Sequence, residues 1–213
     1  MTAERPRIYV LAGVNGAGKS SIGGAAFRAA GADYFNPDEV ARELLAERLG
    51  LTEVEANAAA WRIGRALLER AIEERLDFAF ETTLGGETIP RLLAEAARSG
   101  IEVRVWYVGL ASPELHVERV AARVRRGGHA IPEEIIRRRY KRSRLNLVQL
   151  MPSLAELRVY DNSADADPEA GQVPTPQLVL HLETGRIVGP EDLSQMPDWA
   201  KPIVAAALER GSG

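Results

Sequence analysis

The chain reads Gly13-Val14-Asn15-Gly16-Ala17-Gly18-Lys19-Ser20 close to its beginning. This stretch decides the fold, because it fits the phosphate-binding loop G-x-x-x-x-G-K-S/T at every fixed position. The apolar residues 8–12 precede the loop and predict a strand, and residues 21–28 follow it and predict a helix. Strand, glycine-rich loop and helix form the context that the motif requires. The alternative, a glycine-rich turn with a chance lysine, leaves this agreement unexplained.

The chemistry of the loop follows from its backbone. Glycines at its first, fourth and sixth positions let the chain turn, so that backbone N–H groups and the positive end of the next helix surround a pyrophosphate. We expect the Lys19 ammonium to reach the β- and γ-phosphates and the Ser20 hydroxyl to bind the accompanying Mg²⁺ ion. The residues predicted to bind the nucleotide are Gly13, Asn15, Gly16, Ala17, Gly18, Lys19, Ser20 and Ser21. The predicted cofactors are therefore ATP and Mg²⁺, with GTP left open as the alternative nucleotide, although no N-K-x-D guanine-reading sequence occurs.

Length and composition predict one ordinary globular domain. The 213 residues suit a single domain over 1–213, and the apolar fraction of 46% and charged fraction of 27% are typical of soluble domains. Because the chain contains no cysteine, disulfides and thiolate zinc sites are excluded. No apolar run approaches the roughly 18 residues of a membrane span, so we expect a cytoplasmic protein without a membrane partner.

Strand and helix patterns alternate along the chain. Strands are predicted at residues 8–12, 32–35, 77–81, 103–108, 157–161 and 178–182. Helices are predicted to begin behind Asn36, Thr52 and Ser112, and to cover residues 89–99, 133–147 and 199–208. The alternation predicts an α/β fold, a P-loop NTPase with a parallel, doubly wound sheet flanked by helices. Residues of about 177–213 are expected to form a small C-terminal appendage.

Positive charge is concentrated between residues 119 and 144. This segment holds ten Lys or Arg residues against two Glu, a balance of +8 in a chain whose net charge is -3. A Gly-Gly pair interrupts it, and we interpret the segment as a helical lid whose arginines, above all Arg123 and Arg126, close over phosphates. A solvated helix face is the alternative. Because Tyr140 is the only aromatic residue among these charges, we do not expect a nucleic-acid partner.

Acidic and hydroxyl side chains fall at the expected carboxyl ends of strands, where α/β sheets bind ligands. Transfer of a phosphoryl group to a hydroxyl needs a carboxylate that orients the acceptor and takes its proton, and we predict Asp38 for this role. The alternative is an acid favoured at a helix start by the macrodipole alone. Glu81 and Thr83 are predicted to bind hydroxyls of the acceptor, or else to be a strand-end charge and a helix N-cap.

Absent motifs narrow the class of P-loop protein. The L-S-G-G-Q signature of transporter ATPases does not occur, and the fourth predicted strand, where a Walker B acid is expected, ends at Gly109 without a carboxylate. A small chain with a basic, glycine-hinged segment late in its sequence instead indicates a small-molecule kinase with a lid.

Five motifs in order resemble the zeta-toxin family of P-loop kinases. These are the phosphate-binding loop, Asn36-Pro37-Asp38-Glu39, Glu81-Thr82-Thr83-Leu84, the lid segment 123–132 with its Gly-Gly-His, and Tyr160-Asp161-Asn162-Ser163. The chain is most similar to the bacterial zeta-toxin-like proteins that are labelled predicted ATPases, and the resemblance extends over residues of about 7–163.

The resemblance implies a kinase core and assigns roles to the matched residues. Lys19 and Ser20 are then expected to hold phosphates and magnesium, Asp38 to be the base, and Glu81 and Thr83 to contact a sugar. Characterised toxins of the family phosphorylate UDP-N-acetylglucosamine, so the resemblance implies a nucleotide sugar as the acceptor. One departure concerns the lid, where His129 stands at the position that we align with a toxin arginine.

Two classes of function follow from the sequence. The first is an ATP-dependent kinase that phosphorylates a hydroxyl of a small molecule, with nucleotide sugars, other sugars, antibiotics and nucleotides as the open acceptors. The second is a nucleotide-dependent binding module or toxin component that acts through a partner such as an antitoxin. A kinase should need Asp38 for turnover but not for ATP binding, whereas a binding module should be indifferent to it.

Overall fold

The structure is a computed structural model that describes residues 5–19, 22, 34–47, 50–164 and 175–211. Ser20, Ser21 and most of the helix predicted over 21–28 lie outside the described residues, as does the first half of the strand predicted at 32–35. The predictions for those residues therefore stay predictions.

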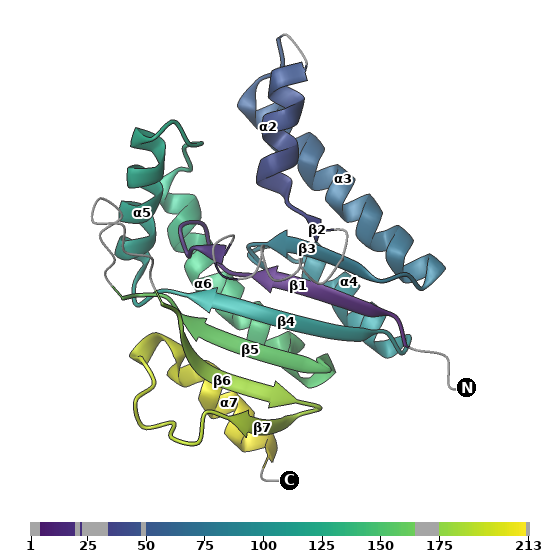
Figure 1. The fold of residues 1–213 in the computed structure, drawn as a ribbon, viewed down its shortest axis with the longest axis vertical. Helices are drawn as coiled ribbons and strands as arrows, with labels where there is room; N and C mark the ends of the chain where they lie inside the picture. Colours follow the sequence, from purple (N-terminus) through teal and green to yellow (C-terminus); the bar gives the residue numbers. More distant parts are fainter. Residues whose placement is uncertain (1–4, 20–21, 23–33, 48–49, 165–174, 212–213) are drawn as a thin grey trace.

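The described strands form one sheet in the order β2-β3-β1-β4-β5-β6-β7 (Figure 1). Their bounds are β1 Arg7–Ala12, β2 Tyr34–Phe35, β3 Phe78–Thr82, β4 Glu102–Gly109, β5 Glu156–Asp161, β6 Gln177–Glu183 and β7 Arg186–Gly189. β1 to β5 are parallel, which confirms the predicted α/β fold around a parallel sheet. β6 and β7 extend the same sheet in antiparallel orientation.

β7 is the one described strand that the sequence did not predict. It follows β6 after the two-residue turn Thr184-Gly185, in which both residues have positive φ, 46° and 79°. A two-residue turn with both φ angles positive is the type that joins strands into a hairpin. The strand itself spans only Arg186–Gly189 and is at most half-buried, so it carries little of the apolar alternation that marks a strand.

Helices begin where the sequence places their caps. Their bounds are α2 Pro37–Glu47, α3 Glu53–Glu74, α4 Thr88–Arg98, α5 Pro113–Arg125, α6 Glu133–Leu150 and α7 Lys201–Gly211, with short 3-10 helices at Met151–Ser153 and Asp198–Ala200. Thr52 and Glu55 form the predicted capping box before α3, and the Ser112 hydroxyl accepts a hydrogen bond from the backbone N–H of Leu115 at the start of α5. Among the described residues no helix combines the length and the apolar character that crossing a membrane requires.

The main core lies on one face of the sheet. Val10 of β1 is in register with Phe80 of β3 and Val105 of β4, and all three are almost fully buried. Helices α4, α6 and α7 cover this face (Figure 1) and bury, among others, Leu93, Leu147 and Ile203. Burial of apolar surface between these layers is the main favourable term in folding.

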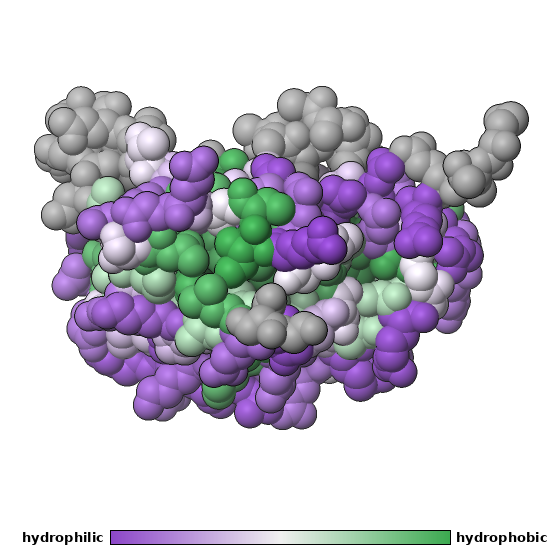
Figure 2. Space-filling view, turned by 90° about the horizontal axis from the view of Figure 1, so that it is seen from below, coloured by the Kyte–Doolittle hydropathy of each residue, from purple (hydrophilic) through white to green (hydrophobic). Residues whose placement is uncertain are grey.

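The sheet positions the site by placing β1 between β3 and β4. The phosphate-binding loop leaves the carboxyl end of β1, while α2 and α3 stand on one side of this edge and α5 on the other (Figure 1). The far end of the molecule is the edge formed by β7 and α7. Figure 2 shows the molecule from below, where apolar surface is framed by polar side chains.

Candidate active site

Glycines of the loop are required by its packing. Gly13 has φ 145°, and a Cβ atom there would lie 2.3 Å from the carbonyl oxygen of Val108 on β4. Gly18 has φ 83°, and its Cβ would lie 2.5 Å from Nδ2 of Asn162. Both positions thus combine a backbone conformation that favours glycine with neighbours that leave no room for a side chain. The loop is held closely against the ends of β4 and β5.

The lysine of the loop is buried and paired. Lys19 is 7% exposed, and its Nζ lies 3.3 Å from Oε1 of Glu81 and 3.4 Å from the carbonyl oxygen of Val14. Glu81 is 9% exposed and accepts a second hydrogen bond from the Tyr34 hydroxyl at 2.9 Å. β3 is the neighbour of β1, which is why its carboxyl end brings Glu81 to the loop. A buried charge is tolerated when it is paired in this way.

Asp38 occupies the helix start that the sequence assigns to it. Its backbone N–H donates to Oδ1 of Asn36 at 3.0 Å, so the Asn36 side chain fixes the first turn of α2. The Asp38 carboxylate is half-exposed, and its Oδ2 lies 3.6 Å from Nη1 of Arg123 on α5. The structure therefore brings the predicted base and one predicted lid arginine together from opposite sides of the loop.

The other arginines of α5 differ in their roles. Arg119 donates to the carbonyl oxygens of Asn162 at 2.8 Å and Ala164 at 3.2 Å, which fastens α5 to the end of β5. Arg126 follows the last residue of α5 and is exposed. Asn162 in turn donates from Nδ2 to the carbonyl oxygen of Ala17 at 2.9 Å, so the motif after β5 contacts the phosphate-binding loop directly.

Two side chains that contact the loop escaped the sequence reasoning. Arg139 of α6 donates from Nη1 to Oδ1 of Asn15 at 2.7 Å, and burial and the nearby Arg138 lower the pKa of its guanidinium. His116 of α5 lies beneath the loop, where its Nδ1 donates to the carbonyl oxygen of Asn15 at 2.8 Å and burial lowers its pKa to about 4. Arg139 belongs to the basic segment, but nothing in the sequence distinguishes it from the arginines beside it.

Side chains of α6 hold the loop that follows β3. The Ser143 hydroxyl of α6 donates to the carbonyl oxygen of Thr83 at 2.7 Å and accepts from the Tyr107 hydroxyl at 3.0 Å. Asn146 donates from Nδ2 to the carbonyl oxygens of Leu84 and Gly86, each at 2.7 Å. The backbone of Thr83 is thus fixed to α6, and the carbonyl oxygen of the preceding Thr82 accepts a hydrogen bond from the N–H of Gly13 in the phosphate-binding loop at 3.1 Å.

A cleft of about 1370 Å³ lies between α2 and α3 on one side and α5 on the other. It brings together Gly16, Gly18, Asp38, Arg119, Arg123 and Arg126. Glu81 and Thr83 are not among the described residues that line it. The structure thus joins the predicted base and lid arginines with the loop, whereas Glu81 is paired with Lys19 and Thr83 does not line the cleft.

The side chains around the loop suit a polyphosphate. Gly13, Gly16 and Gly18 all have positive φ, and the cations Lys19, Arg123 and Arg139 surround the loop from three elements. Such backbone turns and cations are the donor set that phosphate oxygens require. In the described part of the chain no cluster of three His, Asp or Glu side chains forms a metal site by itself.

Fold and site together define the class of protein. A phosphate-binding loop after the interior strand β1, with β3 and β4 beside it, gives the chain a P-loop kinase fold. The chain belongs to the zeta toxin family: the family model described as Zeta toxin matches residues 1–167. This confirms the resemblance that the ordered motifs indicate.

Three comparisons show which proteins the chain is similar to. An uncharacterized protein of Haemophilus influenzae is 32% identical over 132 residues, which are 60% of this chain and 88% of the relative. The solved structure of AvrRxo1-ORF1:-ORF2 with ATP is similar with a TM-score of 0.68 and 16% identity over 96% of this chain, which spans only 64% of that chain. The PezAT chromosomal toxin-antitoxin system of Streptococcus pneumoniae is similar with a TM-score of 0.56 and 16% identity, over 99% of this chain and 87% of that one. At these identities the solved structures show a shared fold.

Proposed function

We propose that the chain is an ATP-dependent kinase that phosphorylates a hydroxyl group of a small molecule. The observation that carries the proposal is the approach of the Asp38 carboxylate and the Arg123 guanidinium, 3.6 Å apart, across the cleft in which the phosphate-binding loop lies. A carboxylate for the acceptor and a cation for the phosphates, opposite each other beside such a loop, are the parts that phosphoryl transfer requires.

Each side chain has a distinct task in this scheme. When bound, Mg-ATP supplies the phosphoryl group. The backbone N–H groups of the loop and the Lys19 ammonium hold phosphate oxygens. Asp38 orients the acceptor hydroxyl and takes its proton as the bond to phosphorus forms. Arg123 and Arg126, together with Arg139, stabilise the negative charge on the transferring group.

The acceptor that we propose is a nucleotide sugar such as UDP-N-acetylglucosamine. This part rests on family membership, and we propose Glu81 and Thr83 as the residues that contact the sugar. In the structure Glu81 is engaged with Lys19 and Tyr34, so a sugar contact requires the carboxylate to exchange partners. Nucleotide binding at Lys19 offers such an exchange, because phosphate oxygens replace the carboxylate as its counter-charge.

The test compares wild type with Asp38→Asn in ADP release from Mg-ATP, against a panel of nucleotide sugars, sugars and nucleosides. We expect acceptor-dependent release and a phosphorylated product, with kcat lower by about 100-fold or more in the variant, the size of a general-base contribution. ATP affinity, measured by calorimetry, should be retained. Glu43→Gln, an exposed acid on the same helix, is the matched control. Equal turnover of Asp38→Asn and wild type would mean that Asp38 only starts the helix.

We also infer an antitoxin-type protein partner. The support is that, of two structures of similar fold, PezAT is a toxin-antitoxin system by name and AvrRxo1-ORF1:-ORF2 is a complex of two proteins. Induced expression in bacteria should then arrest growth with wild type but not with Asp38→Asn. Growth arrest by both proteins would instead favour the binding-module alternative, in which transfer chemistry plays no part.

A further inference from the structure

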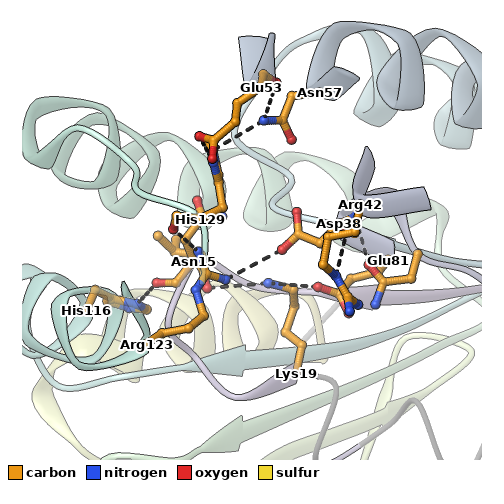
Figure 3. A network of polar contacts seen from close by, with 12 residues as sticks. Asn15, Lys19, Asp38, Arg42, Glu53, Asn57, Glu81, His116, Arg123 and His129 are labelled. Atoms are coloured by element: carbon orange, nitrogen blue, oxygen red, sulfur yellow. Dashed lines mark hydrogen bonds and ion pairs between the residues drawn. The ribbon is translucent and has the colours of Figure 1, made fainter. Parts of the chain in front are cut away.

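The loop between α5 and α6 is fastened to α3 across the cleft. Nδ1 of His129 lies 2.8 Å from Oε2 of Glu53, and its Nε2 lies 3.2 Å from Nδ2 of Asn57 (Figure 3). Glu53 is the first residue of α3 and Asn57 lies one turn later, so both partners come from one helix face. We call these three residues the clasp.

The hydrogen bonds of the clasp fix the state of the imidazole. Nδ2 of Asn57 also donates to the backbone carbonyl oxygen of Glu53 at 2.8 Å, so this atom is the amide nitrogen and can only donate. Nε2 of His129 must therefore accept, and Nδ1–H must donate to the Glu53 carboxylate. A neutral imidazole thus satisfies both contacts at once.

The same loop holds Arg123. The carbonyl oxygen of His129 accepts from Nη2 of Arg123 at 2.9 Å, and the Gly128 N–H donates to the carbonyl oxygen of Arg123 at 3.0 Å. A Cβ at Gly128 would lie 2.6 Å from Cγ of Arg123, so the loop is wrapped against this side chain. The remaining terminal nitrogen, Nη1, is the one that lies 3.6 Å from Asp38. Figure 3 shows the sequence of contacts from Glu53 through His129 and Arg123 to Asp38.

We propose that His129 is a positioning residue: by fastening the loop to α3, it places Arg123 against Asp38 and sets the width of the cleft. This inference rests on the proposed kinase function for its catalytic consequence. In the part of the chain that the structure describes, the hydrogen bonds of the clasp join α3 to the loop after α5 and do not involve the phosphate-binding loop. Loss of the clasp should therefore reduce kcat while the KM for ATP stays within about twofold, because a displaced catalytic group lowers the rate without removing the ligand's own contacts.

Four variants separate positioning from simple packing. His129→Ala should lower kcat by about 10-fold, the scale expected for a side chain displaced by less than 1 Å. Glu53→Ala should match it, and the double variant should be no worse than either single one, because both changes break the same clasp. Glu53→Gln keeps an oxygen that accepts from Nδ1–H and should retain most of the activity. Glu73→Ala, an exposed acid near the other end of α3, is the matched control.

A distance measurement tests the clasp without turnover. Because the chain has no cysteine, spin labels can be attached through Ala58→Cys on α3 and Ala130→Cys in the loop, two exposed positions. We expect a narrow distance distribution in the labelled protein, a broad one when His129→Ala is added, and a narrow one again with Glu53→Gln. Circular dichroism confirms that each variant is folded.

The outcomes are distinct. If His129→Ala leaves the distance distribution between the spin labels unchanged, the clasp does not hold the loop to α3. If the distribution broadens but kcat is unchanged, His129 does not position a catalytic group. If wild type shows no acceptor-dependent turnover, the proposed function fails and the catalytic part of this inference fails with it. In that case the distances still decide whether His129 closes the cleft.

Discussion

Lys19 and Glu81 form a buried ion pair, in which neither charge would be stable without the other. Their side chains are 7% and 9% exposed, and the pair is completed by the Tyr34 hydroxyl on the second carboxylate oxygen. A buried pair adds little net stability, but removing one partner leaves an uncompensated charge. In this loop the lysine has an alternative partner, since it is the residue that the motif assigns to phosphates.

Glu81→Gln should therefore destabilise the nucleotide-free protein by about 3 kcal/mol, the cost of breaking a buried pair. Mg-ATP should restore much of this loss, because phosphate oxygens supply the missing negative charge beside Lys19. Urea unfolding with and without Mg-ATP measures both effects, and Glu87→Gln, whose side chain is 81% exposed, is the control. An equal loss of stability at saturating Mg-ATP would show that Lys19 does not exchange Glu81 for phosphate.

At the scale of elements, α6 connects the two loops of the site. Arg139, Ser143 and Asn146 follow at spacings of four and three, so they share one helix face. Arg139 contacts the phosphate-binding loop, and the other two hold the backbone of the loop after β3. The helix that the sequence identifies only as basic thus positions both Asn15 and Thr83.

Ser143→Ala tests this connection. The change leaves the Tyr107 hydroxyl and the Thr83 carbonyl oxygen without their shared partner in a buried place, which should cost about 1–3 kcal/mol. Because Thr83 is a proposed acceptor contact, the KM for the acceptor should rise more than the KM for ATP. Ser194→Ala, at an exposed serine, should stay within about 0.5 kcal/mol of wild type. A KM for the acceptor that does not move would argue against Thr83 as a contact.

How much of the fold and of the site could be predicted from the sequence depends on how far apart in the chain the interacting residues lie. Caps and turns are local, so Asn36, Thr52 and Ser112 could be placed from a few neighbouring residues. The contacts of Arg139 and His129 join residues 124 and 76 positions apart, and no spacing rule selects them from other basic residues. The Lys19–Glu81 pair also depends on strand order, since it exists because β3 lies beside β1.

At the scale of the whole molecule, β6 and β7 lie outside the family match, which ends at residue 167, but they belong to the same sheet. Trp199 is 4% exposed, and its Nε1 donates to Oδ1 of Asp161 at 2.9 Å. A Cβ at Gly109 would lie 2.2 Å from its ring, so the side chain closes over the carboxyl ends of β4 and β5. These are the strand ends beside the phosphate-binding loop. The C-terminal segment and the site are thus expected to share one cooperative unit.

A variant with a single tryptophan tests this prediction of one domain over 1–213. Trp61→Phe and Trp106→Phe leave Trp199 as the only reporter of the C-terminal segment, whereas circular dichroism reports the helices of the whole chain. For one cooperative unit the two urea transitions coincide. Mg-ATP should also shift the Trp199 transition as far as the circular dichroism transition, because a ligand of the native state stabilises everything that unfolds with its site. The contrary result is a Trp199 transition that occurs at a lower urea concentration and does not shift with Mg-ATP. It would mean that the C-terminal appendage unfolds independently and that the kinase core remains folded without it.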